Sequence, residues 1–289
     1  MTSESGERRP SNADIATLMA TMKASDSVEL KMTVPITDHG ATVAALPIDP
    51  VEAQPRQVFF FDTPELALYE AGVVVRARRI QGGRGDTVVK LRPVVPTELP
   101  ADLRRSASFN VEVDVLPGMI GVCSGSLKGR TTGQEIRDAI AGALPLRKIF
   151  SKEQRALFAE HAPTGIELDQ LQVLGPTFVL KAAWPEPELG NRRLVAEMWL
   201  YQNGERILEL STKCLPSEAF QVAAEARAYL HQHAISTDGV QQLKTKSALE
   251  LFSADLRAEL VAAGRDPETG AARAPKPTPR PRRPTTAPS

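Results

Sequence analysis

The sequence predicts an α+β fold in which antiparallel strands form the core. Several segments alternate polar and apolar residues with a period of two, which is typical of strands that bury one face. Turn signals separate most of these segments, and only a few of the segments are followed by a helical pattern. Because parallel strands need a long crossover between them, usually a helix, this order argues against a parallel doubly wound sheet.

The composition excludes several classes of protein. The chain has 289 residues, of which 42% are hydrophobic and 24% are charged, and this excludes collagen, a coiled coil and wholesale disorder. Its 35 basic residues balance its 35 acidic ones, but residues 271–289 hold basic residues and no acidic residue, so the rest of the chain is acidic overall. A nucleic-acid-binding domain would show a clustered basic excess. We therefore expect no nucleic acid partner for the folded body.

The cysteines and the start of the chain indicate a cytoplasmic protein. Cys123 and Cys214 are too few for a disulfide framework, and no histidine lies near either in the sequence to complete a zinc site. Residues 1–10 lack the apolar core of a signal peptide, and no apolar run approaches the length of a membrane span. We expect reduced thiols and no membrane partner.

The chain divides into four expected parts. They are an N-terminal segment with a short helix (1–26), a β-rich domain (27–235), a C-terminal helix packed on that domain (236–264) and a disordered tail rich in proline and arginine (265–289). The first helix is expected over 14–23, with Asn12 as its cap. The sequence leaves open the tail's partner and whether the chain forms a homodimer.

The first half of the β-rich domain contains strand patterns joined by short turns. We expect strands over 27–34, 57–62, 73–78, 87–92 and 110–115. A short helix over 65–71 is closed by Gly72, and the glycine-rich segment 81–86 predicts a hairpin turn.

The second half begins with small residues, which predict a loop over 118–129. Thr132 and Glu135 form a capping box for a helix that ends near Leu144. We then expect strands over 146–158, 165–171, 177–184, 193–201 and 206–214, the last two joined by an Asn203-Gly204 turn. Two helices over 217–233 and 241–262 complete the folded part.

Charged residues of both signs gather on one face of these strands, and valine, leucine, isoleucine and methionine form the opposite faces. The pairs are Glu29/Lys31, Arg76/Arg78, Lys90/Arg92, Glu112/Asp114, Glu167/Asp169 and Glu209/Lys213. Two arrangements fit this pattern. One is an ordinary structural sheet whose polar face meets water. The other is a closed barrel whose charged faces line a lumen and whose apolar faces are covered by helices. Such a lumen could hold a polyphosphate together with Mg²⁺ or Mn²⁺.

The motifs that carry these charges resemble the CYTH domain of the triphosphate tunnel metalloenzymes, a superfamily that includes class IV adenylyl cyclases, thiamine triphosphatases and inorganic triphosphatases. The matching segments are 28–31, 60–68, 72–78, 89–92, 109–112, 151–155, 167–169 and 207–210. The resemblance runs from Ser27 to about Ile235 and is most specific from Phe61 to Arg92. Segments 194–199 and 207–214 look like a divergent bacterial subgroup often labelled adenylate cyclase. The resemblance implies an eight-stranded, mostly antiparallel CYTH-like β-barrel, open as a tunnel, with packed helices.

The resemblance also implies roles for individual residues. The implied ligands of Mg²⁺ or Mn²⁺ are Glu29, Glu112, Asp114 and Glu209. The implied phosphate-binding residues are Lys31, Arg76, Arg78, Lys90, Arg92, Lys152 and Arg155. Further candidates are Glu167, Asp169, Lys181, Glu197 and Lys213. Glu29, Lys31 and Glu112 are the implied catalytic residues. The implied chemistry is attack on a triphosphate, by water in hydrolysis or by a ribose hydroxyl in ATP cyclisation.

The sequence departs from the family pattern at three places. Ser27 and Ser211 stand where the family has acidic residues, and Lys152 and Arg155 are three residues apart instead of two. A lumen with fewer acidic residues could bind an anion well while it holds a metal poorly. The alternative hypothesis is therefore a sensor that binds polyphosphate or a nucleotide without catalysis.

Overall fold

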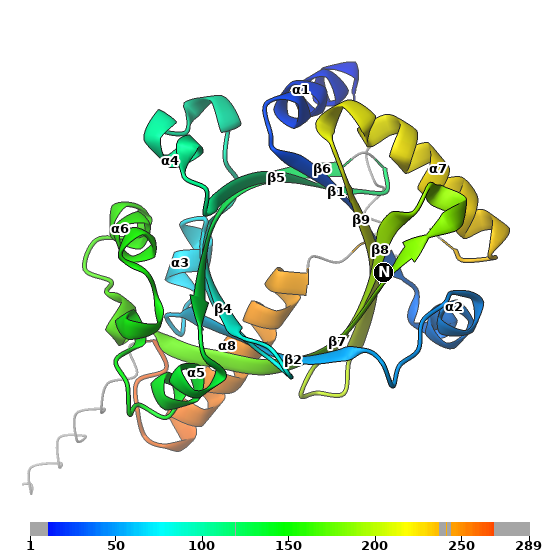
Figure 1. Cartoon of the computed structure of the whole chain (residues 1–289). Coiled ribbons are helices and arrows are strands. Elements are labelled where there is room, and N and C mark those ends of the chain that lie inside the picture. The colour runs from blue at the N-terminus through cyan, green and yellow to red at the C-terminus, as the bar shows by residue number, and fades with distance from the viewer. Residues whose placement is uncertain (1–10, 119, 237–240, 242–243, 269–289) are drawn as a thin grey trace, which may run out of the picture.

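The core of the protein is a closed β-barrel of nine strands, shown end-on in Figure 1. The computed structural model describes residues 11–118, 120–236, 241 and 244–268. The strands are β1 (Ser27–Val34), β2 (Gln54–Asp62), β3 (Val73–Ile80), β4 (Gly85–Leu91), β5 (Phe109–Leu116), β6 (Ile120–Thr131), β7 (Gln172–Glu186), β8 (Arg192–Leu200) and β9 (Arg206–Cys214).

The order of strands around the barrel is β1-β5-β6-β4-β3-β2-β7-β8-β9, and β9 pairs with β1 to close it. All neighbouring pairs are antiparallel except β1 and β5, which run parallel from Ser27 to Leu30. The predicted α+β class and the mostly antiparallel barrel are confirmed. The predicted count of eight strands is wrong by one.

The strand β6 lies where a loop was predicted over 118–129. Its small residues are required by close packing against the barrel wall. A Cβ atom on Gly125 would lie 2.5 Å from Cζ of Phe109, and one on Gly129 would lie 2.3 Å from Oε1 of Gln154. Glycine therefore marks crowding in a strand here.

The strands predicted over 146–158 and 165–171 are absent. These residues form η3 (Leu146–Ile149), α6 (Lys152–His161) and η4 (Leu168–Gln170). A capping box between Ser151 and Gln154 starts α6. Gln154 is fully buried, and its amide donates to the backbone carbonyls of Thr87 (3.1 Å) and Leu127 (3.0 Å). These bonds hold α6 against the outside of β4 and β6.

Most helices surround the barrel on its outside (Figure 1). They include α1 (Asn12–Lys23), α2 (His39–Ala45), α3 (Ala67–Glu70), α4 (Ala101–Arg105), α5 (Gly133–Ile140), α6 and α7 (Ala219–Gln232). Their apolar residues pack on the outward faces of the strands, so that Ile136 and Phe158 join Val75, Val89 and Val111 in one buried cluster. Burial of this apolar surface is the main stabilising term.

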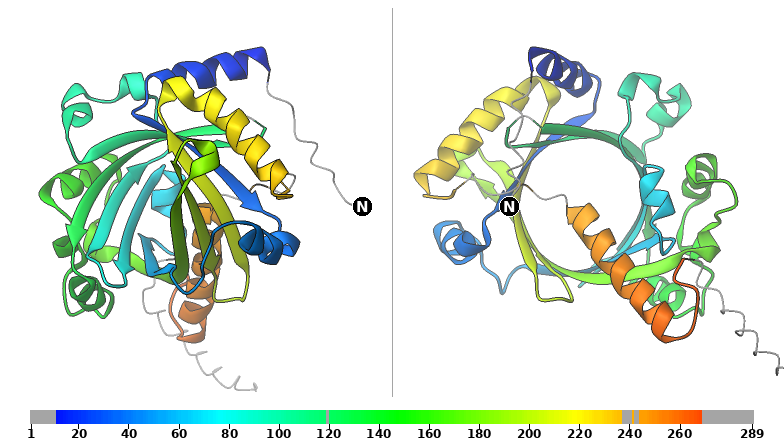
Figure 2. Two further views of the ribbon diagram at one scale, coloured as in Figure 1. Left: turned by 45° about the vertical axis from the view of Figure 1, so that its right-hand side comes forward. Right: turned by 180° about the vertical axis from the view of Figure 1, so that it is seen from behind.

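The helix α8 (Lys244–Ala262) lies across one end of the barrel, as both Figure 1 and the rear view in Figure 2 show. Its residues Leu249 and Phe252 pack in one buried cluster with Phe60, Val74 and Trp199. Val74 and Trp199 lie two residues from Arg76 and Glu197 on their strands, so they share the lumen face with these charged residues. The C-terminal helix therefore covers part of this end of the predicted tunnel.

The helix termini differ in detail from prediction. Ser11, in place of Asn12, caps α1 through a capping box with Asp14, and α7 begins at Ala219, two residues later than predicted. The tail from 269 onwards and residues 1–10 lie outside the described residues. Within the described residues, no helix is both long and apolar enough to span a membrane.

Candidate functional site

The lumen of the barrel collects charged side chains from most of its strands. Because side chains alternate along a strand, residues two apart share a face, and the charged set faces inward while Val75, Val89, Val111 and Val113 face the helices. The predicted residues on the lumen face are Glu29, Lys31, Arg76, Arg78, Lys90, Arg92, Glu112, Asp114, Lys181, Glu197, Glu209 and Lys213. The barrel alternative, with its charged lumen, is the one that the fold supports.

Three carboxylates form a cluster where β1 and β5 run parallel. Glu29 and Asp114 are register partners, and Glu112 lies two residues before Asp114 on the same face. One carboxylate oxygen from each lies within 4.8 Å of the others. Hard oxygen donors gathered in this way fit Mg²⁺ or Mn²⁺, which prefer carboxylate ligands.

Lysines and an arginine of the same lumen contact these carboxylates. Lys31 Nζ lies 3.1 Å from Glu29 Oε2 and 2.8 Å from Asp114 Oδ1, and Arg92 Nη2 lies 3.0 Å from Asp114 Oδ2. Lys213 pairs with Glu112 and lies 3.8 Å from Glu29. The cluster is thus an ion-pair network of both signs.

The network keeps the carboxylates ionised. Burial alone would raise the pKa of Asp114, but the positive charges of Lys31, Lys90 and Arg92 hold that pKa well below its usual range. Burial would also raise the pKa of Glu29, but Lys31 and Lys213 lower it, and the net effect is a lowered pKa. Ionised carboxylates are the form that a divalent cation binds.

The serines in the family's acidic positions support this cluster. Ser27 Oγ donates to Glu112 Oε2 at 3.3 Å, and Ser211 Oγ donates to Glu29 Oε1 at 3.2 Å. Each serine therefore orients a carboxylate where the family pattern would place another carboxylate.

Two of the predicted phosphate-binding residues in the lumen, Arg76 and Lys90, form no ion pair with any residue that the structure describes. Arg76 has a buried Nε without a hydrogen-bond partner. Burial lowers the pKa of Arg76 to about 9, with a further contribution from Arg78. Burial also lowers the pKa of Lys90 to about 8, against an opposing effect of Asp114. Positive charges held without a counter-ion are what an anion-binding site requires.

A second set of charges lies further along the lumen. Arg78 forms a two-pronged contact with Asp86, with Nη2 2.7 Å from Oδ2, and Lys181 Nζ lies 3.2 Å from Glu197 Oε1. Sequence reasoning missed further charged residues on these faces, among them Arg56, Asp86 and Lys128. Extending the period-two pattern by one step before Val58 would have found Arg56, and reading 124–128 as a strand would have found Lys128.

Glu209 and Glu197 share a cation that sequence reasoning also missed. Lys244, the first residue of α8, has its Nζ 2.6 Å from Glu209 Oε1 and 2.8 Å from Glu197 Oε2. Glu209 was predicted as a metal ligand, and in the structure this lysine lies against it.

Four predicted site residues lie outside the lumen, which corrects their placement. Lys152 and Arg155 are on α6, where Arg155 Nη1 donates to the carbonyl of Phe150 at 2.7 Å. Glu167 and Asp169 are at η4, and Asp169 pairs with Arg147. Because the predicted strands are helical here, their charged residues face the exterior of the barrel.

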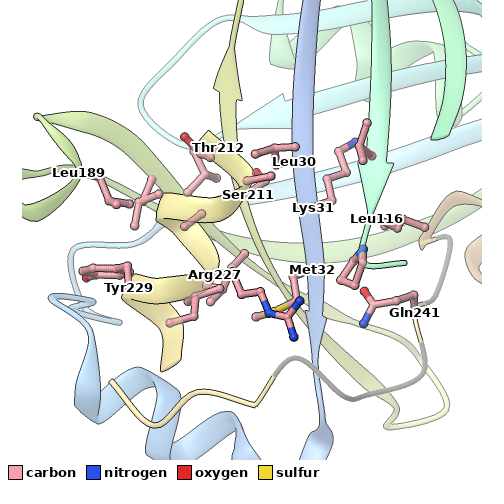
Figure 3. Close-up of a pocket in the computed structure, with 18 of the residues that line it drawn as sticks. Leu30, Lys31, Met32, Leu116, Leu189, Ser211, Thr212, Arg227, Tyr229 and Gln241 are labelled. Atoms are coloured by element: carbon pink, nitrogen blue, oxygen red, sulfur yellow. The ribbon is translucent and has the colours of Figure 1, made fainter. Parts of the chain in front are cut away.

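A separate cavity of about 600 Å³ lies on the outer side of β1 and β9, under α7 (Figure 3). Its lining is mostly apolar and includes Leu30, Met32, Leu189 and Tyr229. Lys31 and Ser211, which belong to the charged network of the lumen, also line it, so the cavity reaches the edge of that network.

Solved structures share this fold. A "putative adenylate cyclase" from Bacillus halodurans aligns with a TM-score of 0.53 at 15% identity over 77% of this chain and 97% of its own. A "putative adenylyl cyclase" from Hippeastrum, described as having a dominant triphosphatase activity, aligns with a TM-score of 0.55 at 15% identity over 74% of this chain and 91% of its own. No protein-family profile matches the chain, and no curated protein matches its sequence. These structures therefore confirm the fold that the sequence resemblance implied.

Proposed function

We propose that this protein binds a triphosphate in the lumen and hydrolyses one of its phosphoanhydride bonds with the help of Mg²⁺ or Mn²⁺. The observation that carries the proposal is that Lys90, which forms no ion pair with any described residue, lies close enough to Asp114 and Glu112 of the carboxylate cluster to feel their charges. Arg76, on the neighbouring strand β3, adds a second such cation to the same lumen. The likeness in fold to the Hippeastrum protein, for which triphosphatase activity is described, also supports the proposal.

Each group has a distinct part in this proposal. Arg76 and Lys90 would bind phosphate oxygens, with Arg78 and Arg92 adjoining them on the same strands, since guanidinium groups form bidentate contacts with phosphate. Glu29, Glu112 and Asp114 would hold the divalent ion, which when bound neutralises charge on the phosphate oxygens. Catalysis then consists mainly of positioning and charge stabilisation.

In hydrolysis, the oxygen of water bonds to the terminal phosphorus as the bridging P–O bond breaks. Orthophosphate leaves together with the shortened phosphate chain. Cyclisation of ATP would use the same lumen but would need a ribose hydroxyl as the nucleophile, and it would release diphosphate.

The second candidate is a sensor that binds polyphosphate without turnover. The observation that favours it is that Lys31, Arg92 and Lys213 already contact the three carboxylates. If these three side chains stay on the carboxylates, they exclude the metal ion, while Arg76 and Lys90 can still bind phosphate.

Product analysis separates these functions. The purified protein is mixed with inorganic triphosphate, ATP or thiamine triphosphate in the presence of Mg²⁺ or Mn²⁺, and the products are resolved by chromatography. Release of orthophosphate supports the hydrolase, and cyclic AMP with diphosphate supports the cyclase. Binding with intact substrates in every mixture would refute catalysis and leave the sensor.

A further inference from the structure

Lys244 reaches into the lumen although it belongs to a helix and not to a strand of the barrel. It is the first residue of α8, whose N-terminal end points toward the middle of the barrel (Figure 1, Figure 2). Its side chain is 11% exposed, and its ammonium contacts the carboxylates of both Glu197 and Glu209 at 2.8 and 2.6 Å. The ammonium also lies 4.8 Å from the ring centroid of Trp199.

Glu197 and Glu209 need a cation between them. They are direct register partners on the antiparallel strands β8 and β9, and both point into the lumen. Like charges placed directly opposite on neighbouring strands repel one another. Among the residues that the structure describes, Lys181 forms an ion pair with Glu197, at 3.2 Å, and none with Glu209, so Lys244 is the group that joins the pair. A divalent cation would satisfy the same two carboxylates, and Lys244 stands where it would bind.

The position of Lys244 is fixed by the rest of its helix. Ala248, Leu249 and Phe252 are buried in the apolar cluster at the end of the barrel. Ser253 Oγ donates to the carbonyl of Pro64 at 2.6 Å and anchors the next turn. The lysine is therefore held at the carboxylates by packing of the helix and is not a freely moving surface side chain.

We propose that Lys244 is the resident cation of the Glu197–Glu209 pair, so that this pair takes no divalent ion and the lumen has one metal site, at Glu29, Glu112 and Asp114. This inference rests on the proposed function for the existence of that one site. It assigns to the C-terminal helix a role in setting how many metal ions the lumen holds.

The test counts Mn²⁺ bound per full-length chain, by electron paramagnetic resonance and calorimetry, without any phosphate ligand. The central variant is Lys244→Met, which removes the ammonium and keeps a side chain of similar length. The matched control is Lys246→Met on the same helical turn, since Lys246 is exposed and pairs with Glu250 across the helix surface.

We expect Lys244→Met to bind one more Mn²⁺ than the wild type and Lys246→Met to bind the same number. Adding Glu209→Gln to Lys244→Met should remove the extra ion. An unchanged number in a folded Lys244→Met protein, checked by circular dichroism, overturns the inference.

A further variant covers the case in which Lys244→Met does not fold. Glu209→Gln alone leaves Lys244 paired with Glu197 and should bind as many Mn²⁺ ions as the wild type. Loss of one ion in this variant would show that the pair binds metal in the native protein, and the inference would fail.

These counts also separate this inference from the proposed function. The difference of one ion between Lys244→Met and the wild type tests the role of Lys244. The absolute count for the wild type tests the site at Glu29, Glu112 and Asp114, because a wild type that binds no Mn²⁺ contradicts that site alone.

Discussion

Arg76 and Arg78 lie two residues apart on β3 and face the same lumen, but their surroundings differ. Arg78 donates to both oxygens of Asp86, at 2.7 to 3.0 Å. Arg76 has no ion pair within the part of the chain that the structure describes, and its Nε has no partner. The ion pair with Asp86 offsets the free-energy cost of removing Arg78 from water. No ion pair among the described residues offsets that cost for Arg76. A protein that keeps such a charge does so at a cost in stability, which suggests that a ligand compensates it.

The two arginines should therefore respond to substitution in opposite directions. Without ligand, Arg76→Met should stabilise the protein, by about 1–4 kcal/mol if it behaves like other replacements of buried charges by apolar side chains. Arg78→Met should destabilise it by about 1–3 kcal/mol, because Asp86 loses its partner. Chemical denaturation of each variant measures both changes. A loss of stability in Arg76→Met equal to that in Arg78→Met would argue against an uncompensated charge.

Lys90 should make anion binding depend on pH. Its pKa is lowered to about 8 by burial, from 10.5. The native chain then binds fewer protons at this group than the unfolded chain between about pH 8 and 10.5, so this group's contribution to the free energy of unfolding rises with pH in that window. Triphosphate needs the charged form, so its affinity should fall as the pH rises above about 8, by up to about tenfold per pH unit.

Calorimetric titration with inorganic triphosphate at several pH values checks this dependence. The control is Lys90→Met. The ligand itself titrates in the same way with both proteins, so the affinity of the variant should depend less on pH above pH 8. Parallel profiles for the two proteins would mean that Lys90 does not contact the anion.

Single residues were the most predictable part of the site wherever a strand was correctly placed. Period-two spacing alone put Glu29 with Lys31 and Glu112 with Asp114 on shared faces, and the structure brings all four together. The same reasoning placed Lys152 and Arg155 wrongly, because a capping box and a buried glutamine make their segment a helix. Lys244 carried no local signal, since its position depends on how the last helix packs.

At the scale of elements, β6 shows how glycine can mislead. Its run of glycine and serine is typical of a loop, but the glycines lie where Phe109 and Gln154 approach the strand. Only the tertiary packing reveals that crowding, and so the sequence pattern predicted a loop where β6 lies. The hairpins and the capping box at Thr132 were predictable because they depend on residues a few positions apart.

Gly125→Ala tests this account of β6. The new Cβ would meet the ring of Phe109 at 2.5 Å, so we expect a destabilisation of about 1–3 kcal/mol and a lower melting temperature. Gly133→Ala is the matched control, because the nearest atom to its Cβ would be Nε of Arg79 at 3.8 Å. Equal melting temperatures for the two variants would contradict the packing explanation.

At the scale of the whole molecule, the barrel separates an apolar exterior under helices from a lumen that holds charges of both signs (Figure 1). Alternation along each strand predicted this separation, but not that α8 covers part of one end. That contact depends on an apolar cluster in which α8 packs against residues of β2, β3, β7, β8 and β9. Local patterns could not place that helix, and with it they could not place the lysine that contacts Glu209.

The central claim is that the lumen binds a triphosphate through Arg76 and Lys90. The most direct test is a calorimetric titration of inorganic triphosphate, with Mg²⁺, into the wild type and two double variants that lose the same charge. Arg76→Met with Lys90→Met removes the lumen cations, and Lys152→Met with Arg155→Met removes cations on α6, outside the barrel. The account predicts binding by the wild type and the α6 variant and a loss of at least about 100-fold in affinity for the lumen variant. Equal affinities in all three proteins, or no binding by the wild type, would contradict it.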